Sequence, residues 1–417
     1  MSKPTYELAD IIKEYRTSFI QKHSPLKQHQ RVLNAIEHCR TAYLGYHLDR
    51  CDSCNHERIS YNSCRNRHCP KCQGTNRERW IMARKNDLLS TSYFHVVFTL
   101  PSELNPYCLR FPKELYNILF AASKETIMQF GDDPKHLGAQ MGIISVLHTW
   151  GQNLSLHPHV HMIIPGGGIT KAGNWKYLKN NGEYLFCVKA LSKVYKGKLM
   201  EKLKLFLQTI NQPMSIRVKE KLYNQNWVVY AKESFGGPDQ VIEYLGRYSH
   251  KIAISNHRIK NIENGNIVFS YKDYAHGNVQ KLMPLKAEDF LQRFCMHILP
   301  PKFMKIRHYG ILASRTKPKL KMQQMKMGIL IIKKGKQNEQ AKGWKEITKN
   351  RLGFDVDACP CCKKGRMIRV MSFDANAPPP KKCGEPFGGA CPESSRRAQD
   401  KLHRNIHNKL ILNNKQN

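Results

Sequence analysis

One short stretch constrains the fold more than any other: residues 154–169, which read LSLHPHVHMIIPGGGI. Its apolar run, which alternates with other residues and stops at a proline, predicts a buried strand. Within this run, His159 and His161 flank Val160. Side chains at i and i+2 of a strand point to the same face, about 6.6 Å apart. The two imidazoles are therefore placed to bind one divalent metal ion, while Val160 points into a core.

A histidine pair of this kind is more often structural than metal-binding, so the metal hypothesis depends on the residues around it. His157 extends the alternation to a third imidazole, although Pro158 can bend the strand there. Three consecutive glycines, 166–168, follow the strand. Because they have no side chains, the backbone there can approach a ligand bound to the metal. A second group of polar residues lies far along the chain, on a helix described below. Its chemistry would also need a phosphate that is bound to a metal ion.

The charge balance indicates a polyanionic partner. The 417 residues include 68 Lys and Arg against 32 Asp and Glu, a formal net charge of +36, and nucleic acid is the commonest polyanion. A membrane surface is the competing partner. However, no run approaches the ~20 apolar residues that span a bilayer, and the N-terminus lacks a signal-peptide core. We therefore expect a soluble intracellular protein of two or three domains.

Fourteen cysteines in an intracellular chain argue for metal binding rather than disulfides. Two Cys-x-x-Cys hooks lie near the N-terminus, and each hook places two thiolates on one side of a tight turn. We expect them to close one structural zinc tetrahedron, formed by Cys51, Cys54, Cys69 and Cys72. Three further residues can replace a hook ligand or join a second ion: Cys64, His56 and His68.

A second cysteine group lies near the C-terminus. The run Cys359-Pro360-Cys361-Cys362 resembles half of a zinc hook, with Cys383 and Cys391 as candidate partners. Their spacing is irregular and three prolines intervene, so the sequence leaves a second zinc site undecided.

Arginines cluster around the N-terminal hooks. Arg65, Arg67 and Arg77 lie on or just after a module that zinc would make rigid. Arginines on such modules commonly contact phosphates, so we expect these three to bind DNA, the alternative being an ordinary solvated surface.

The order of elements predicts an α+β domain with a largely antiparallel sheet. A strand over 93–100 precedes a helix over 113–128, a strand over 142–148 and then the histidine strand. A doubly wound parallel sheet would require crossovers that this order lacks. Further elements are expected as two helices within 5–45, helices over 192–210 and 286–299, and a hairpin around Asn264-Gly265.

A helix that begins at Pro238 carries the second polar group. Tyr244 and Tyr248 lie four residues apart, so their side chains share one helix face with Cβ atoms about 6 Å apart. A phenol has an ordinary pKa near 10 and is a poor nucleophile at neutral pH. It becomes useful where a metal polarises the phosphate and cations such as Lys251 and Arg247 stand nearby, and we expect Arg247 to bind DNA as well. Packing of the two rings into a core is the alternative.

Three motifs together resemble the two-tyrosine HUH transposases of the IS91 type of bacterial insertion sequence, which are close to the ISCR-type elements. These motifs are CDSC…SCRNRHCPKC, TWGQNLSLHPHVHMIIPGGG and YLGRYSHK, in the order that the family shows. The resemblance covers roughly residues 20–315. The spacing Tyr-x-x-x-Tyr-x-x-Lys is also similar to rolling-circle replication initiators of phages, and Phe98-Thr99-Leu100 resembles their first motif.

The resemblance implies an HUH endonuclease core, with a ferredoxin- or RRM-like antiparallel sheet, preceded by a small zinc-binding module. It implies that His159 and His161 hold Mg²⁺ or Mn²⁺, with His157 as the expected third ligand and Gln152 as the alternative. One tyrosine, assisted by Lys251, would attack single-stranded DNA and form a 5′-phosphotyrosine link. The second tyrosine would allow another cleavage during rolling-circle-like transposition.

The partners implied are single-stranded DNA at the element ends, target DNA and a host helicase or the replication machinery, in the cytoplasm and at the nucleoid. We expect five segments: helices (1–50), zinc module and following helix (51–90), nuclease core (91–300), basic extension (301–350) and a partly disordered cysteine-containing tail (351–417). A replication initiator or relaxase with the same chemistry is one alternative. A non-catalytic zinc-ribbon nucleic-acid-binding protein is the other.

Overall fold

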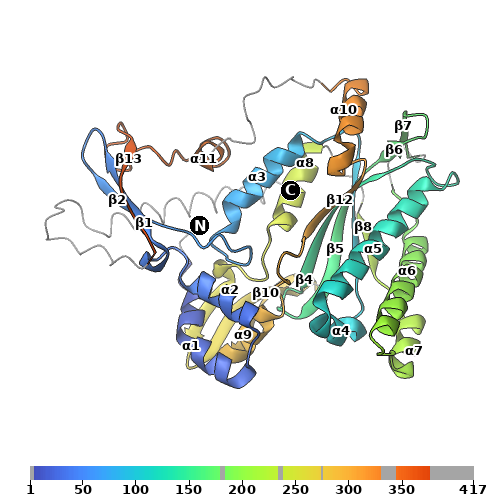
Figure 1. Ribbon diagram of the computed structural model, residues 1–417, viewed down its shortest axis with the longest axis horizontal. Coiled ribbons are helices and arrows are strands. Elements are labelled where there is room, and N and C mark those ends of the chain that lie inside the picture. The colour runs from blue at the N-terminus through green and yellow to red at the C-terminus, as the bar shows by residue number, and fades with distance from the viewer. Residues whose placement is uncertain (1–3, 179–183, 233–237, 274–275, 330–343, 376–417) are drawn as a thin grey trace. The chain divides into compact units, whose positions relative to one another are not determined.

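The computed structural model describes residues 4–178, 184–232, 238–273, 276–329 and 344–375 (Figure 1). The chain forms two compact units, and both are discontinuous in sequence. The first unit comprises Met1–Arg79, Ile252–Ile298 and Gln337–Asn417. The second comprises Trp80–Lys251 and Leu299–Lys336. The five consecutive segments expected from the sequence therefore differ from the units of the structure, because each unit takes residues from both halves of the chain.

The first unit contains two small antiparallel sheets. One has the strand order β13-β1-β2, so a strand from near the C-terminus pairs with the N-terminal hairpin. The other has the order β11-β10-β9 and contains the hairpin expected at Asn264-Gly265. The bounds are α1 (Leu8–His23), α2 (Lys27–Glu37), β1 (Tyr46–Cys51), β2 (Glu57–Tyr61), β9 (Ile259–Glu263), β10 (Asn266–Asp273), β11 (Val279–Lys286), α9 (Ala287–Cys295), α11 (Trp344–Leu352) and β13 (Met367–Phe373).

A five-stranded sheet organises the second unit, with the order β12-β4-β5-β3-β8 and every neighbouring pair antiparallel (Figure 1). This confirms the expected α+β class with an antiparallel sheet. Its elements are β3 (Tyr93–Thr99), α4 (Asn105–Arg110), α5 (Pro112–Asp132), β4 (Gly142–Trp150), β5 (Leu156–Pro165), β6 (Gly167–Ile169), β7 (Trp175–Tyr177), α6 (Val188–Thr209), α7 (Ile216–Asn224), β8 (Val229–Lys232), α8 (Pro238–Ser249), β12 (Ile306–Gly310) and α10 (Lys317–Lys326). Helix α3 (Gln73–Lys85) crosses the boundary between the units in sequence.

The two faces of this sheet differ. On one face, Val160, Met162 and Ile164 of β5 pack into the main hydrophobic core with residues of α5 and α6. On the other, Ile163 of β5 packs with Val241 of α8. Because side chains alternate along a strand, the histidines at 159 and 161 share the face of Ile163, toward α8. The core on the first face thus holds β5 in the register that presents its histidines on the second.

The segment after residue 300 was expected to be a weakly patterned basic extension, and this is wrong for residues 306–326. β12 pairs with β4 and forms one edge of the central sheet. α10 follows it, and Leu320 of this helix is buried with Ile144 and Ile163. The many lysines and arginines of residues 306–326 concealed this strand and helix in the sequence, since an edge strand and a surface helix need few apolar residues.

No helix in the described part of the chain combines the length and the apolar character that a membrane span requires.

A substitution at Gly310 can test the junction between β12 and α10. The φ of this glycine is +59°, and an added Cβ would lie 1.8 Å from the carbonyl oxygen of Met141. We expect Gly310→Ala to lower the free energy of unfolding by at least ~2 kcal/mol, because both the left-handed φ and the backbone clash oppose it. Gly197→Ala in α6 is the control: nothing lies within 4 Å of its Cβ, so the change should be neutral or stabilising by up to ~1 kcal/mol. Urea unfolding measures both, and equal losses would contradict the prediction.

Candidate active site

Three histidines meet on the α8 side of the central sheet. His148 of β4 and His159 of β5 are direct partners in the antiparallel register, and His161 lies two residues further along β5. One ring nitrogen from each lies within 4.8 Å of the other two. Three imidazoles at this separation can bind one metal ion.

The second ring nitrogen of each histidine is held by a hydrogen bond. His159 Nδ1 donates to the carbonyl of His157 at 2.6 Å, and His148 Nε2 donates to the carbonyl of Tyr248 at 2.8 Å. His161 Nδ1 shares a 2.8 Å hydrogen bond with His95 Nε2. His161 Nε2 is buried and has no hydrogen-bond partner among the described residues. Such outer contacts orient metal-binding imidazoles, so the three rings are prepared to bind an ion.

Burial keeps these histidines neutral. Loss of solvation lowers the pKa of His159 to about 4 and lowers the pKa values of His148 and His161 well below the ordinary range. The neighbouring imidazoles and Lys251 act in the same direction, more weakly. A neutral imidazole is the form that binds a metal, so no proton has to leave at neutral pH.

The two tyrosines of α8 lie directly against the histidines. The ring centroid of Tyr248 is 4.4 Å from that of His161. The Tyr248 hydroxyl donates to the Tyr244 oxygen at 2.9 Å, and the Tyr244 oxygen is 3.5 Å from His95 Nδ1. Lys251 Nζ lies 5.7 Å from the centre of the Tyr248 ring. The structure thus brings together the phenols, the histidine strand and the lysine that the sequence singled out.

The structure does not place the expected third ligand in this cluster. His157 is exposed and lies outside the three-histidine cluster, to which it contributes only the backbone carbonyl that orients His159. His148 lies in the cluster where His157 was expected. It lies opposite His159, which the strand alternation along β5 alone could not reveal.

His95 was also missed. It lies on β3, next to β5, and joins the His161 imidazole to Tyr244. Both missed histidines interrupt apolar runs in segments that the sequence predicts to be strands. A polar, metal-binding residue type within a buried strand, rather than any motif, was the signal available for them.

The cysteines form two clusters instead of one. Cys69 and Cys72 lie with Cys39 and Cys64, whereas Cys51 and Cys54 lie with Cys359 and Cys362. The single tetrahedron expected from Cys51, Cys54, Cys69 and Cys72 is therefore wrong, because the two hooks belong to different clusters. His56 and His68 are in neither cluster, and Cys383 and Cys391 lie outside the described residues.

The arginines expected to bind DNA have different surroundings. Arg65 and Arg67 are exposed. Arg77 donates through Nε and Nη2 to Glu78, which occupies part of its guanidinium. Arg247 lies on α8, and its side chain is outside the described part of the structure. DNA contact by these four remains a prediction.

Two family models match the chain. A model described as a putative transposase matches residues 142–319, which include the histidine cluster and both tyrosines. A model described as a transposase zinc-binding domain matches residues 11–100. The "putative transposase y4qJ" of Sinorhizobium fredii is 39% identical over 394 residues, which cover 91% of this chain and 99% of the relative. The chain belongs to the IS91-type transposases.

A second relative agrees with this assignment. The transposase for insertion sequence element IS801 of Pseudomonas savastanoi pv. phaseolicola is 30% identical over 292 residues, which cover 67% of this chain and 68% of the relative. No solved structure matches the chain.

Family membership confirms the transposase assignment and disfavours both alternatives, the replication initiator and the non-catalytic zinc ribbon. The N-terminal region is a zinc-binding domain. The clusters fit that metal, since four thiolates are a standard ligand set for structural zinc.

Proposed function

We propose that this transposase cleaves and rejoins single-stranded DNA through a 5′-phosphotyrosine intermediate on Tyr244 or Tyr248. The observation that carries the proposal is the 4.4 Å contact between the rings of Tyr248 and His161. It puts two candidate nucleophiles beside three imidazoles that can hold a divalent ion. The antiparallel sheet with this histidine pair on its middle strand, β5, supports an HUH endonuclease core.

The donor set indicates which metal the site would take. His148, His159 and His161 offer three neutral imidazole nitrogens, and the cluster includes no carboxylate from the described residues. Imidazole binds first-row transition metals, of which Mn²⁺ is the weakest binder, whereas Mg²⁺ prefers oxygen ligands, so of the two expected ions Mn²⁺ fits these residues better. When bound, such an ion would polarise the scissile phosphate and make the phosphorus more electrophilic.

The covalent step is a transesterification. The phenol oxygen of one tyrosine attacks the phosphorus of the scissile phosphodiester and loses its proton to solvent. The bond between phosphorus and the 3′ oxygen breaks, and this oxygen takes up a proton to become a free 3′-hydroxyl. The number of phosphodiester bonds is unchanged, so rejoining to a new 3′-hydroxyl requires no ATP.

The protein's own charges favour this step. Lys251 Nζ lies near the Tyr248 ring, where its positive charge stabilises a developing phenolate. Lys305 Nζ lies 5.1 Å from the centre of the Trp150 ring and donates to the carbonyl of Lys251. Two lysines at one edge of the histidine cluster also attract the DNA phosphate.

Two adjacent nucleophiles fit a reaction with two cleavages. Tyr244 and Tyr248 are hydrogen-bonded to each other at 2.9 Å, so either phenol can reach the same phosphate position after a small movement. One tyrosine can then hold the first strand while the other attacks the second. The DNA substrates would be the single-stranded element ends and the target, with strand separation supplied by a host helicase or the replication machinery.

The nucleophiles are tested with single-stranded element-end DNA and Mn²⁺. We expect the parent protein to form a covalent protein–DNA adduct that survives a denaturing gel. The Tyr244→Phe/Tyr248→Phe variant should lose at least 100-fold of this adduct, because no phenol remains beside the histidines. Tyr230→Phe is the control, since this tyrosine is exposed on β8. An undiminished adduct in the double variant would show that another residue attacks.

The ligand assignment is tested by Mn²⁺ affinity, measured from the electron paramagnetic resonance signal of the free ion. We expect His148→Ala to weaken binding at least tenfold, because it removes one of three ligands. His157→Ala should change it less than twofold, since its side chain is exposed and its carbonyl still accepts the hydrogen bond from His159. The reverse order would return the third ligand to His157.

A further inference from the structure

The cluster formed by Cys51, Cys54, Cys359 and Cys362 lies only half within the matched zinc-binding domain. The sulfur of Cys51 is 3.7 Å from that of Cys362, and the sulfur of Cys54 is 3.6 Å from that of Cys359. Zn–S bonds of about 2.3 Å place the sulfurs of a tetrahedral site about 3.8 Å apart. The four cysteines are free thiols with the spacing of a zinc tetrathiolate.

The two hooks have the same backbone conformation. In the first, the N–H of Asn55 donates to the carbonyl of Cys51 at 3.2 Å, and Asn55 has a φ of 54°. In the second, the N–H of Lys363 donates to the carbonyl of Cys359 at 3.1 Å, and Lys363 has a φ of 59°. Each hook therefore turns back through a left-handed residue directly after its second cysteine. This conformation points both sulfurs of a hook to one side.

Backbone N–H groups also point at the sulfurs. The Ser53 N–H donates to Cys51 Sγ at 3.4 Å, and the Gly365 N–H donates to Cys362 Sγ at 3.3 Å. Hydrogen bonds of this kind stabilise thiolate charge, which the metal-bound form requires.

Gly365 shows how closely the second hook approaches the first. A Cβ added there would lie 2.4 Å from Cys51 Sγ and 2.6 Å from the side-chain oxygens of Asp52 and Ser53. No residue with a side chain fits without displacing the cluster. The glycine therefore lets the backbone of residues 363–366 close against the N-terminal hook.

Contacts next to the cluster hold the two hooks side by side. β13 pairs with β1, with Cys51 opposite Met367. The Asp52 side chain accepts a hydrogen bond from the backbone of Arg366 at 2.8 Å.

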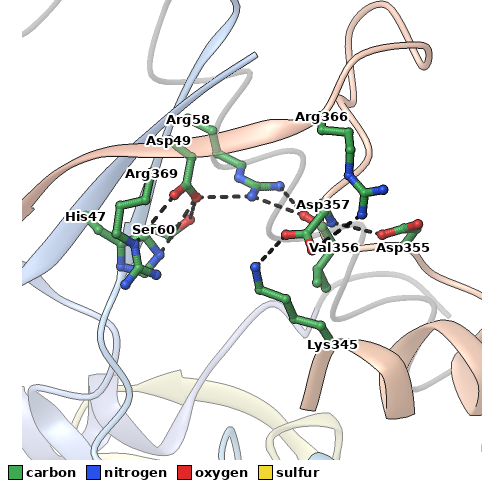
Figure 2. Close-up of polar contacts among 10 residues, drawn as sticks. All are labelled: His47, Asp49, Arg58, Ser60, Lys345, Asp355, Val356, Asp357, Arg366 and Arg369. Atoms are coloured by element: carbon green, nitrogen blue, oxygen red, sulfur yellow. Dashed lines mark hydrogen bonds and ion pairs between the residues drawn. The ribbon is translucent and has the colours of Figure 1, made fainter. Parts of the chain in front are cut away.

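Beside the cluster, the Arg58 side chain joins the N-terminal sheet to the segment that precedes the second hook. Its guanidinium donates to Asp49 at 3.1 Å and to the carbonyl of Val356 at 3.2 Å, as Figure 2 shows. Arg58 thus attaches the C-terminal segment to β2.

We propose that Cys51, Cys54, Cys359 and Cys362 form a second structural zinc site, which fastens residues 353–375 to the N-terminal zinc-binding module. The first site would consist of Cys39, Cys64, Cys69 and Cys72. The module is then incomplete without a hook that lies about 300 residues further along the chain. This proposal is independent of the DNA cleavage reaction.

The test replaces zinc with Co²⁺ in the full-length protein. Thiolate-to-metal absorption bands report only sulfur ligands, so cobalt at the histidine cluster does not contribute. We expect the parent protein to show two tetrathiolate sites per chain. Cys359→Ser/Cys362→Ser should halve the thiolate bands, and Cys39→Ser/Cys64→Ser should halve them as well. Cys361→Ser is the matched control, because Cys361 is exposed between the two ligands and belongs to neither cluster.

A conservative variant distinguishes the loss of a zinc ligand from misfolding of the chain. Cys362→His should keep cobalt at both cysteine sites but shift the visible bands of one of them, since an imidazole nitrogen replaces one of four sulfurs. Gly365→Ala should weaken metal retention at the second site only, whereas Gly197→Ala should leave it unchanged. Two full tetrathiolate sites in Cys359→Ser/Cys362→Ser, or only one in the parent protein, would overturn the proposal.

Discussion

The two-residue alternation of β5 is the constraint on which the candidate active site depends. The apolar residues of one parity, Val160, Met162 and Ile164, are fully buried in the main core. They therefore hold the strand in a register that sends His159 and His161 to the opposite face. The antiparallel neighbours then bring His148 and His95 beside them. A slip of one residue would turn the histidines into the main core and Val160, Met162 and Ile164 toward α8, so packing and chemistry are specified by the same pattern.

Burial of neutral imidazoles also sets the electrostatics of the site. Because the cluster includes no carboxylate from the described residues, an ion bound there would keep its full double charge. Lys251 and Lys305 add positive charge at the edge. A phosphodiester is then the natural counter-ion, and in a partly buried site its attraction to the centre is stronger than in water. Carboxylate ligands would have cancelled part of that attraction.

Much of this site could be predicted from sequence, because its signals are local. The helix face shared by Tyr244 and Tyr248 and the strand face shared by His159 and His161 follow from the periods of helix and strand. The third histidine could not be predicted in the same way. His148 lies opposite His159 because of the register in which β4 pairs with β5. That register depends on the length of the loop between the strands and on a bulge, and neither is evident from residue types. His157 satisfied the alternation, but the register of β4 and β5 shifts beside it, between His148 and Trp150, and its side chain is exposed.

The cysteines show the same limit more sharply, and loop closure explains why. Local spacing favoured pairing Cys54 with the hook at Cys69, yet its partner Cys359 is 305 residues away. Closing a loop roughly twenty times longer adds only ~3 kcal/mol, because closure entropy grows with the logarithm of length. Structural zinc binding releases about 10–16 kcal/mol, and the pairing of β1 with β13 contributes as well. Sequence distance is therefore a weak guide to which hooks share an ion, and the contacts of the intervening strands decide.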